Sequence, residues 1–181
     1  MTDLLQETEE TPTSYPASPA GMSDPATWID AAIIWERIEA YTRTRYTARR
    51  VVWTVEGREG ENWKPPLIPM TSQTAEKWES GGWVAVTLPD GPVGLCLPSD
   101  SVFKVTAQVG GGTPPAAVTE AFRRLAEYMA DGDDDRAGVS SYTVNMGGAI
   151  QESYQRSAAH AARALQNSGA ADLLRPYRRQ K

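Results

Sequence analysis

The hydrophobic pattern of this chain changes its period twice, and this change constrains the fold more than any other feature. Between residues 49 and 109 apolar and polar side chains alternate, as at Val51, Trp53 and Val55. Alternation with a period of two is typical of β-strands that bury one face. On both sides of this region, apolar residues recur at the three- and four-residue spacing of helices. The sequence therefore predicts an α+β fold, a small helical bundle with an antiparallel β region inserted over residues 49–109.

The β region is expected to contain four to six short antiparallel strands joined by tight turns. Strands are expected over residues 51–55, 83–88, 93–97 and 102–109. The segment 64–69 must be extended, because each of its prolines disfavours helix in the preceding residue. All six tryptophans, at positions 28, 35, 53, 63, 78 and 83, precede residue 84. We expect them to pack this sheet against the first helix.

The first predicted helix covers residues 25–44 and begins at a proline. Ser23 or Asp24 can cap it, and Pro25 suits its first turn. Apolar side chains cover most of its circumference: Trp28, Ile29, Ala31, Ala32, Ile33, Ile34, Trp35, Ile38 and Tyr41. A helix that is apolar on more than one side is usually buried on more than one side. Its second side is therefore expected either against a neighbouring subunit or in the chain's own core.

Two further helices are predicted after the glycine run at 110–112. The first, over residues 114–130, is amphipathic, with Val118, Phe122 and Leu125 on its apolar face. The second is predicted over residues 149–167. Its apolar stripe consists of Ile150, Tyr154, Ala158, Ala161 and Leu165. A stripe this rich in alanine buries little apolar area by itself, so the last helix is expected to need a partner.

The two ends of the chain differ in charge and are expected to be segments outside the folded domain of residues 24–169. Residues 1–23 are acidic and proline-rich, and they predict a flexible segment. Residues 156–181 carry six basic residues and one acidic residue, although the whole chain has a net charge of −5. Residues 170–181 therefore predict an extended basic arm. Such ends are either solvated tails or docking segments; nucleic-acid binding is disfavoured, because only Tyr177 lies nearby to stack.

Several kinds of chemistry are disfavoured by what the sequence contains. One cysteine, Cys96, and one histidine, His160, cannot build a disulfide framework or a two-histidine zinc site. The run 110–112 lacks the Lys-Ser/Thr of a phosphate loop. The acidic run 131–135 is followed by Arg136 where a calcium loop needs glycine. We therefore expect no cofactor, no metal and no catalytic residues. We expect a cytoplasmic binding or structural protein that has no signal peptide and no membrane span.

A set of short motifs in a fixed order resembles a known family. The motifs are Ile38-Glu39-Ala40-Tyr41-Thr42-Arg43, Trp53, Lys64-Pro65-Pro66-Leu67, Phe103-Lys104-Val105-Thr106, Pro115-Ala116-Ala117-Val118 with Ala121 and Leu125-Ala126, and Leu173-Leu174-Arg175-Pro176-Tyr177-Arg178. Together they span residues 26–178 and resemble the head–tail adaptor (connector, head-completion) proteins of long-tailed siphophages and gene transfer agents. Members of that family often carry a further helix before the one expected at 25–44.

The resemblance implies a non-enzymatic virion protein at the neck, assembled in the host cytoplasm. It implies a ring of about twelve copies beneath the portal, which extends the DNA channel without binding DNA sequence-specifically and joins the head to stopper or tail proteins. Portal docking is then expected from Tyr154, Leu165, Leu173, Leu174, Arg175, Pro176, Tyr177, Arg178 and Arg179. Contacts between ring neighbours are expected from Trp28, Ile29, Ile33, Trp35, Ala158, Ala161 and Ala162.

Two other functions are compatible with the sequence. A stopper or tail-terminator protein of the same virion would also be small, ring-forming and non-enzymatic. A cytoplasmic module that binds a sugar or another small ligand could use Trp63, Trp78 and Trp83 as a platform.

Overall fold

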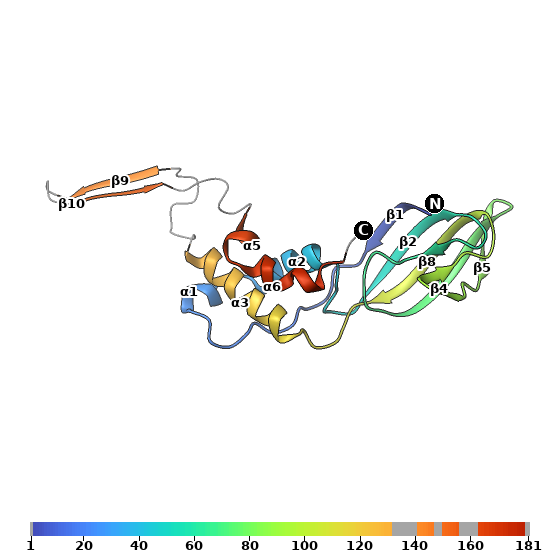
Figure 1. Cartoon of the computed structure of the whole chain (residues 1–181), viewed down its shortest axis with the longest axis horizontal. Coiled ribbons are helices and arrows are strands. Elements are labelled where there is room, and N and C mark those ends of the chain that lie inside the picture. The colour runs from blue at the N-terminus through green and yellow to red at the C-terminus, as the bar shows by residue number, and fades with distance from the viewer. Residues whose placement is uncertain (1, 132–140, 147–149, 156–162, 180–181) are drawn as a thin grey trace. The chain divides into compact units, whose positions relative to one another are not determined.

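The computed structural model describes residues 2–131, 141–146, 150–155 and 163–179. The chain divides into two compact units. The β unit comprises residues 1–16, 42–113 and 178–181, and the helical unit comprises residues 17–41 and 114–177 (Figure 1). The predicted α+β class, with antiparallel strands and a few helices, is confirmed.

Two antiparallel sheets form the β unit. Its strands are β1 (Asp3–Glu9), β2 (Arg49–Gly57), β3 (Asn62–Trp63), β4 (Met70–Glu79), β5 (Gly82–Val86), β6 (Asp90–Gly91), β7 (Gly94–Cys96) and β8 (Ser101–Val109). The larger sheet has the order β1-β2-β8-β4-β5, and the smaller one has the order β3-β7-β6. Strand β4 was not expected, because its sequence is mostly polar. It forms because both of its edges are paired, one with β8 and one with β5.

The core of the β unit lies on one face of the larger sheet. Val51, Trp53 and Val55 of β2 are fully buried, as the alternating pattern predicts. The facing residues of β8, Ala107, Val105 and Phe103, are paired with them and are buried as well. The ring of Trp63 on β3 meets Trp53 edge-on, with 5.4 Å between the ring centroids. An edge-to-face pair of this kind adds about 0.5–1.5 kcal/mol to the energy of burial.

The N-terminal segment differs from the prediction of a flexible tail over residues 1–23. Strand β1 pairs along β2 at the edge of the sheet. The Glu9 carboxylate accepts hydrogen bonds from Arg45 Nη2 at 2.7 Å and from Arg49 Nη1 at 2.9 Å, and Trp53 Nε1 donates to Glu7 at 2.8 Å. These contacts join residues about forty positions apart, so composition near the N-terminus does not reveal them.

The helical unit contains short helices around one long one. Its elements are α1 (Asp24–Thr27), α2 (Ala31–Thr42), α3 (Ala116–Asp131), α5 (Ala164–Asn167), α6 (Ala170–Leu174), the 3-10 helix η1 (Arg175–Tyr177) and the strands β9 (Ser141–Met146) and β10 (Ile150–Gln155). The amphipathic helix predicted over 114–130 is α3, and it buries Val118, Phe122 and Leu125. The single helix predicted over 25–44 is instead two helices. Asp30 accepts a hydrogen bond from the amide of Ala32 and so caps the second one.

The core of the helical unit is built on α3. Trp35 of α2 packs against Phe122, with ring centroids 5.1 Å apart, and both are almost completely buried. Ala170 and Leu174 of α6 are also buried, and α6 packs along α3. The hydroxyl of Tyr41 donates to the carbonyl of Ala171 at 3.4 Å.

The helix predicted over residues 149–167 is wrong. Residues 150–155 form strand β10, which pairs antiparallel with β9, and α5 covers only Ala164–Asn167. The spacing of Ile150 and Tyr154 explains the error, because residues four apart share a face in a helix and in a strand alike. Ala158, Ala161 and Ala162 lie outside the described residues. The extended arm predicted from residue 170 is also wrong as far as residue 177, since α6 and η1 occupy it.

Within the described ranges, no helix combines the length and the apolar character needed to cross a membrane.

Candidate functional site

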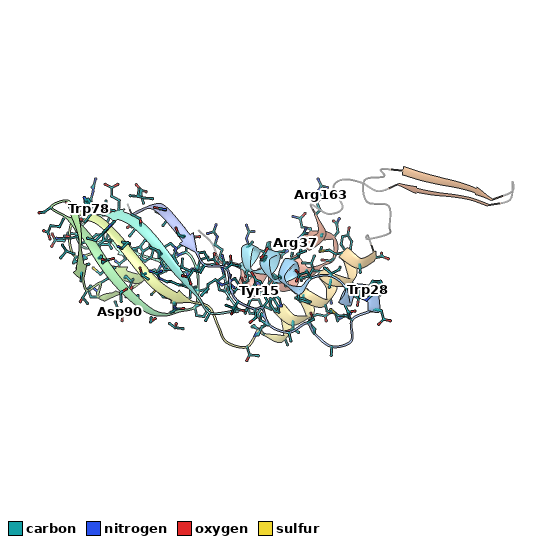
Figure 2. The ribbon with its side chains drawn as sticks, turned by 180° about the vertical axis from the view of Figure 1, so that it is seen from behind. Tyr15, Trp28, Arg37, Trp78, Asp90 and Arg163 are labelled. Carbon is teal, nitrogen blue, oxygen red and sulfur yellow. The ribbon has the colours of Figure 1, made fainter. Side chains whose placement is uncertain are left out.

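An apolar surface on the helical unit is the clearest candidate for a binding surface. The side chain of Trp28, which follows α1, is 83% exposed, and Ile33 on α2 is 45% exposed (Figure 2). Ile29 between them is half-buried. We call Trp28, Ile29 and Ile33 the Trp28 surface. The sequence analysis singled out all three residues, because the predicted helix is apolar on more than one side.

Trp35, which was also predicted to contact a neighbouring subunit, does not belong to the Trp28 surface. Trp35 is 1% exposed and belongs to the core of the helical unit, where it packs on Phe122. Its side chain is therefore not available to a neighbouring subunit. The sequence could not separate Trp28 from Trp35, because both lie in the same apolar run.

The C-terminal residues predicted to dock on a partner also divide by burial. Leu174 is fully buried, and Leu165, Leu173, Tyr177 and Arg179 are half-buried. Arg175, Pro176 and Arg178 are exposed, and Arg175 lies 3.4 Å from the carboxylate of Asp172 at the surface. We call Arg175, Pro176 and Arg178 the basic end. For Tyr154 the structure describes the backbone, in β10.

The exposed side of α3 carries a cluster of ion pairs. Glu120 accepts hydrogen bonds from Arg123 at 2.7 Å and from Arg124 at 2.9 Å, and these bonds lower the pKa of Glu120 to about 2. Hydrogen bonds from the hydroxyl and the amide of Ser23 lower the pKa of Glu127. Carboxylates held in the ionised form do not serve as general acids near neutral pH. These pairs tie the segment before α1 to α3 and stabilise the exposed face.

A pair of tryptophans on the β unit forms a second exposed surface. Trp78 of β4 and Trp83 of β5 pair directly across the hairpin and are 46% and 37% exposed (Figure 2). Their rings meet edge-on at 5.1 Å, and the ammonium group of Lys104 lies 4.7 Å from the ring centroid of Trp83. This placement differs from the expectation that the tryptophans pack a sheet against a helix. Trp63, which was grouped with them as a platform, is buried.

Acidic clusters, Cys96 and the glycine run at 110–112 are the remaining candidates for metal binding or other chemistry. No group of three His, Cys, Asp or Glu side chains lies close enough within the described ranges to hold a metal ion. Cys96 is a half-buried free thiol on β7. The glycine run at 110–112 lies at the end of β8, where Gly110 makes a close contact with the backbone of two other segments. Its amide donates to Pro69 O at 2.7 Å, and a Cβ there would lie 2.3 Å from Thr47 O.

Comparisons with known proteins add no relative to this description. No protein-family model, no curated protein and no solved structure matches the chain. The exposed surfaces of the two units and the motifs in the sequence are therefore the features that bear on function.

Proposed function

We propose that this protein is a structural head–tail adaptor, which assembles as a ring of about twelve copies beneath a phage portal and joins the head to the stopper or tail. The observation that carries the proposal is the Trp28 surface. An indole that is 83% exposed, five residues before an exposed isoleucine, is costly to leave in water on a helical unit of this size. Large aromatic side chains of this kind are the usual anchors of protein–protein contacts.

A ring requires a head-to-tail contact in which each copy presents two different surfaces. The Trp28 surface would supply one of them. The second surface of the ring contact is expected elsewhere on the helical unit. This unit has twelve acidic and seven basic residues and is therefore acidic.

The basic end supports the portal contact of the same proposal. Arg175 is the first residue of η1 and Arg178 follows its last residue; both side chains are exposed, so they can pair with carboxylates of a larger partner. The motif that resembles the family's closing Leu-Leu-x-Pro-Tyr-Arg includes both arginines. Leu174 in the same motif holds α6 in the helical core.

The decisive experiment is to produce particles that lack this protein and to ask whether filled heads acquire tails. The proposal expects filled heads without tails, and normal tail attachment would contradict it. A ring also predicts that Trp28→Ser prevents assembly on the portal, while Trp83→Ser, at the exposed pair of the β unit, serves as the matched control.

The portal contact can be tested separately from the ring. The double variant Arg175→Ala/Arg178→Ala is expected to lose co-sedimentation with the portal and to keep its circular dichroism, because both side chains are exposed. Unchanged co-sedimentation would remove the basic end from the proposal. A stopper or tail-terminator role in the same virion is the alternative, and a low-resolution map of the neck separates them by position.

The Trp78–Trp83 pair favours a second candidate function of another class, the binding of a sugar or similar small ligand. Exposed aromatic rings stack on apolar faces of such ligands. Ligand screens followed by tryptophan fluorescence test it. A response lost in Trp83→Ser would support this candidate, and no response to any ligand would exclude it.

A further inference from the structure

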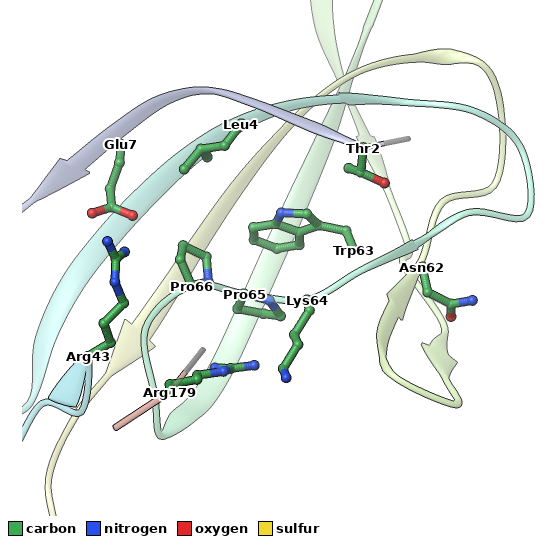
Figure 3. A pocket seen from close by; sticks show the side chains of 10 residues that line it. All are labelled: Thr2, Leu4, Glu7, Arg43, Asn62, Trp63, Lys64, Pro65, Pro66 and Arg179. Atoms are coloured by element: carbon green, nitrogen blue, oxygen red, sulfur yellow. The ribbon is translucent and has the colours of Figure 1, made fainter. Parts of the chain in front are cut away.

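A pocket in the β unit has no role in the proposed ring and gathers an unusual set of side chains. It has a volume of about 630 Å³ and lies between β1 and the segment that follows β3 (Figure 3). Its walls combine three cations, Arg43, Lys64 and Arg179, with one carboxylate, Glu7. Its apolar lining includes the indole of Trp63. Every lining residue belongs to the β unit.

Arg179 lines the pocket with a hydrogen-bonding group that none of the described residues satisfies. Its amide donates to Thr42 O at 3.2 Å, which anchors the backbone. Its Nη1 atom is buried and has no hydrogen-bond partner among the described residues. Burial lowers the pKa of Arg179. A buried guanidinium nitrogen without an acceptor is expensive, so an acceptor supplied from outside the chain would be stabilising.

Arg43 occupies a backbone position that an arginine adopts at a cost. Its φ is +59°, in the left-handed region that favours glycine. The cost of holding a side chain there is about 1–2 kcal/mol. In Figure 3 its guanidinium group points toward Glu7, whose carboxylate is already used by Trp53 Nε1. Residues with a strained backbone concentrate at binding sites, and Arg43 is a strained residue that lines a pocket.

The rest of the pocket is suited to an apolar body next to a negative charge. Trp63 and Pro65 in its lining are buried, and the accessible apolar surface is that of Leu4, which is 46% exposed, and of the half-buried Pro66. We propose that this pocket binds an extended acidic peptide segment of a partner protein, with its carboxylates on Arg43, Lys64 and Arg179 and an apolar side chain on Leu4 and Pro66. Charge complementarity carries the choice of occupant, because the pocket has two more cations than carboxylates.

Nucleic acid is the less favoured anion. The β unit contains eleven basic and eleven acidic residues, so the pocket is not part of a broad basic surface that follows a phosphate backbone. The apolar part of the lining suits an aliphatic side chain of a peptide and makes no favourable contact with a phosphate. The pocket could bind a peptide whether or not the protein forms a ring.

Calorimetric titration of the full-length protein with two blocked hexapeptides tests the proposal. The acidic probe is acetyl-Gly-Leu-Asp-Leu-Glu-Leu amide, and the basic control probe carries lysine at both acidic positions. We expect the acidic probe to bind with a Kd below about 1 mM and the basic probe not to bind. A short DNA duplex is the third ligand, and preferential binding of the duplex through the same residues would overturn the proposal.

Matched variants distinguish the pocket from general electrostatic attraction. Arg179→Gln and Arg43→Gly should each weaken binding of the acidic probe about tenfold, because each removes a charge-assisted hydrogen bond. Arg43→Gly also removes the backbone strain, so the variant is expected to fold. The controls are Arg58→Gln in the exposed turn after β2 and Arg50→Gln at the exposed pair with Glu10. No binding of the acidic probe, or an equal loss in the controls, would overturn the proposal.

Discussion

Both units divide their tryptophans between a core and the surface, but they expose them to different degrees. In the β unit Trp53 and Trp63 lie inside a cluster of thirteen buried residues, which extends across both sheets. In the helical unit Trp35 is buried on Phe122, but Trp28, seven residues earlier, is almost fully exposed. The exposed pair of the β unit, Trp78 and Trp83, is 46% and 37% exposed, whereas Trp28 of the helical unit is 83% exposed. A tryptophan is therefore buried or exposed according to the face of its element that it occupies, whatever the apolar run in which it lies.

The largest effect is expected from the core of the β unit. Trp53→Ala should lower the free energy of unfolding of that unit by about 3–5 kcal/mol, since it leaves a large cavity beside Trp63. Chemical denaturation followed by tryptophan fluorescence measures the loss. The helical circular dichroism should survive to higher denaturant than the fluorescence transition. Trp83→Ala, at an exposed position, is the control and should cost far less; coincident loss of both units would contradict their separate cores.

A backbone contact gives the next largest effect in the β unit. An alanine at the positive φ of Gly110 carries a strain of about 1–3 kcal/mol. Gly110→Ala should destabilise the β unit by more than this strain, because the new Cβ would also clash with Thr47 O at 2.3 Å. Gly111→Ala is the matched control: its φ is +102°, but no atom lies within 4 Å of a Cβ there. Thermal unfolding measures both variants. Equal shifts would mean that the close approach to Thr47 does not hold the end of β8.

Acid should weaken the attachment of β1 before it weakens the helical unit. Burial alone would raise the pKa of Glu9, but the hydrogen bonds and charges of Arg45 and Arg49 outweigh it, and the pKa is lowered from 4.5. A carboxyl whose pKa is lowered by folding stabilises the folded state at pH values above its ordinary pKa of 4.5. This contribution is lost as the pH falls from 4.5 through the lowered pKa.

Glu9→Gln should therefore cost about 1–2 kcal/mol at pH 7 and flatten the acid dependence of stability. Hydrogen exchange of the β1 amides measures the effect. Glu10→Gln is the control, since Glu10 and Arg50 form an exposed pair at 3.7 Å. An acid profile that is the same in Glu9→Gln and the wild-type protein would remove the ion pairs from the account of β1.

The smallest effect on stability is expected in the helical unit, at Trp28. Trp28→Ser should change the free energy of unfolding by less than about 0.5 kcal/mol, because the side chain is exposed in the single chain. Association measured by light scattering should nevertheless fall. A loss of stability comparable with that of Trp35→Ser would show that Trp28 packs within its own unit.

Sequence patterns predicted the elements whose burial follows a local period. Strands β2 and β8 and helix α3 show alternating or three-to-four spacing, and each has one buried face. Strand β1 has an almost uniformly exposed burial pattern, so no local period marked it. Of the candidate surfaces, Trp28 and the basic end were predicted from apolar and charged runs. The pocket was not predicted, because its cations come from positions 43, 64 and 179.

By itself the sequence determined the α+β class, the position of the β region between helical segments, and the amphipathic face of α3. These features depend on side chains within one or two turns or a few alternations of each other. The tertiary structure decided the pairing of β1 and β4, the replacement of a predicted helix by β10, and the division of the tryptophans into buried and exposed sets. The pairing of β1 with β2 and of β4 with β8 joins residues far apart in the chain, and even β10 depends on pairing with a second strand, β9. A local hydrophobic period contains no information about such pairs.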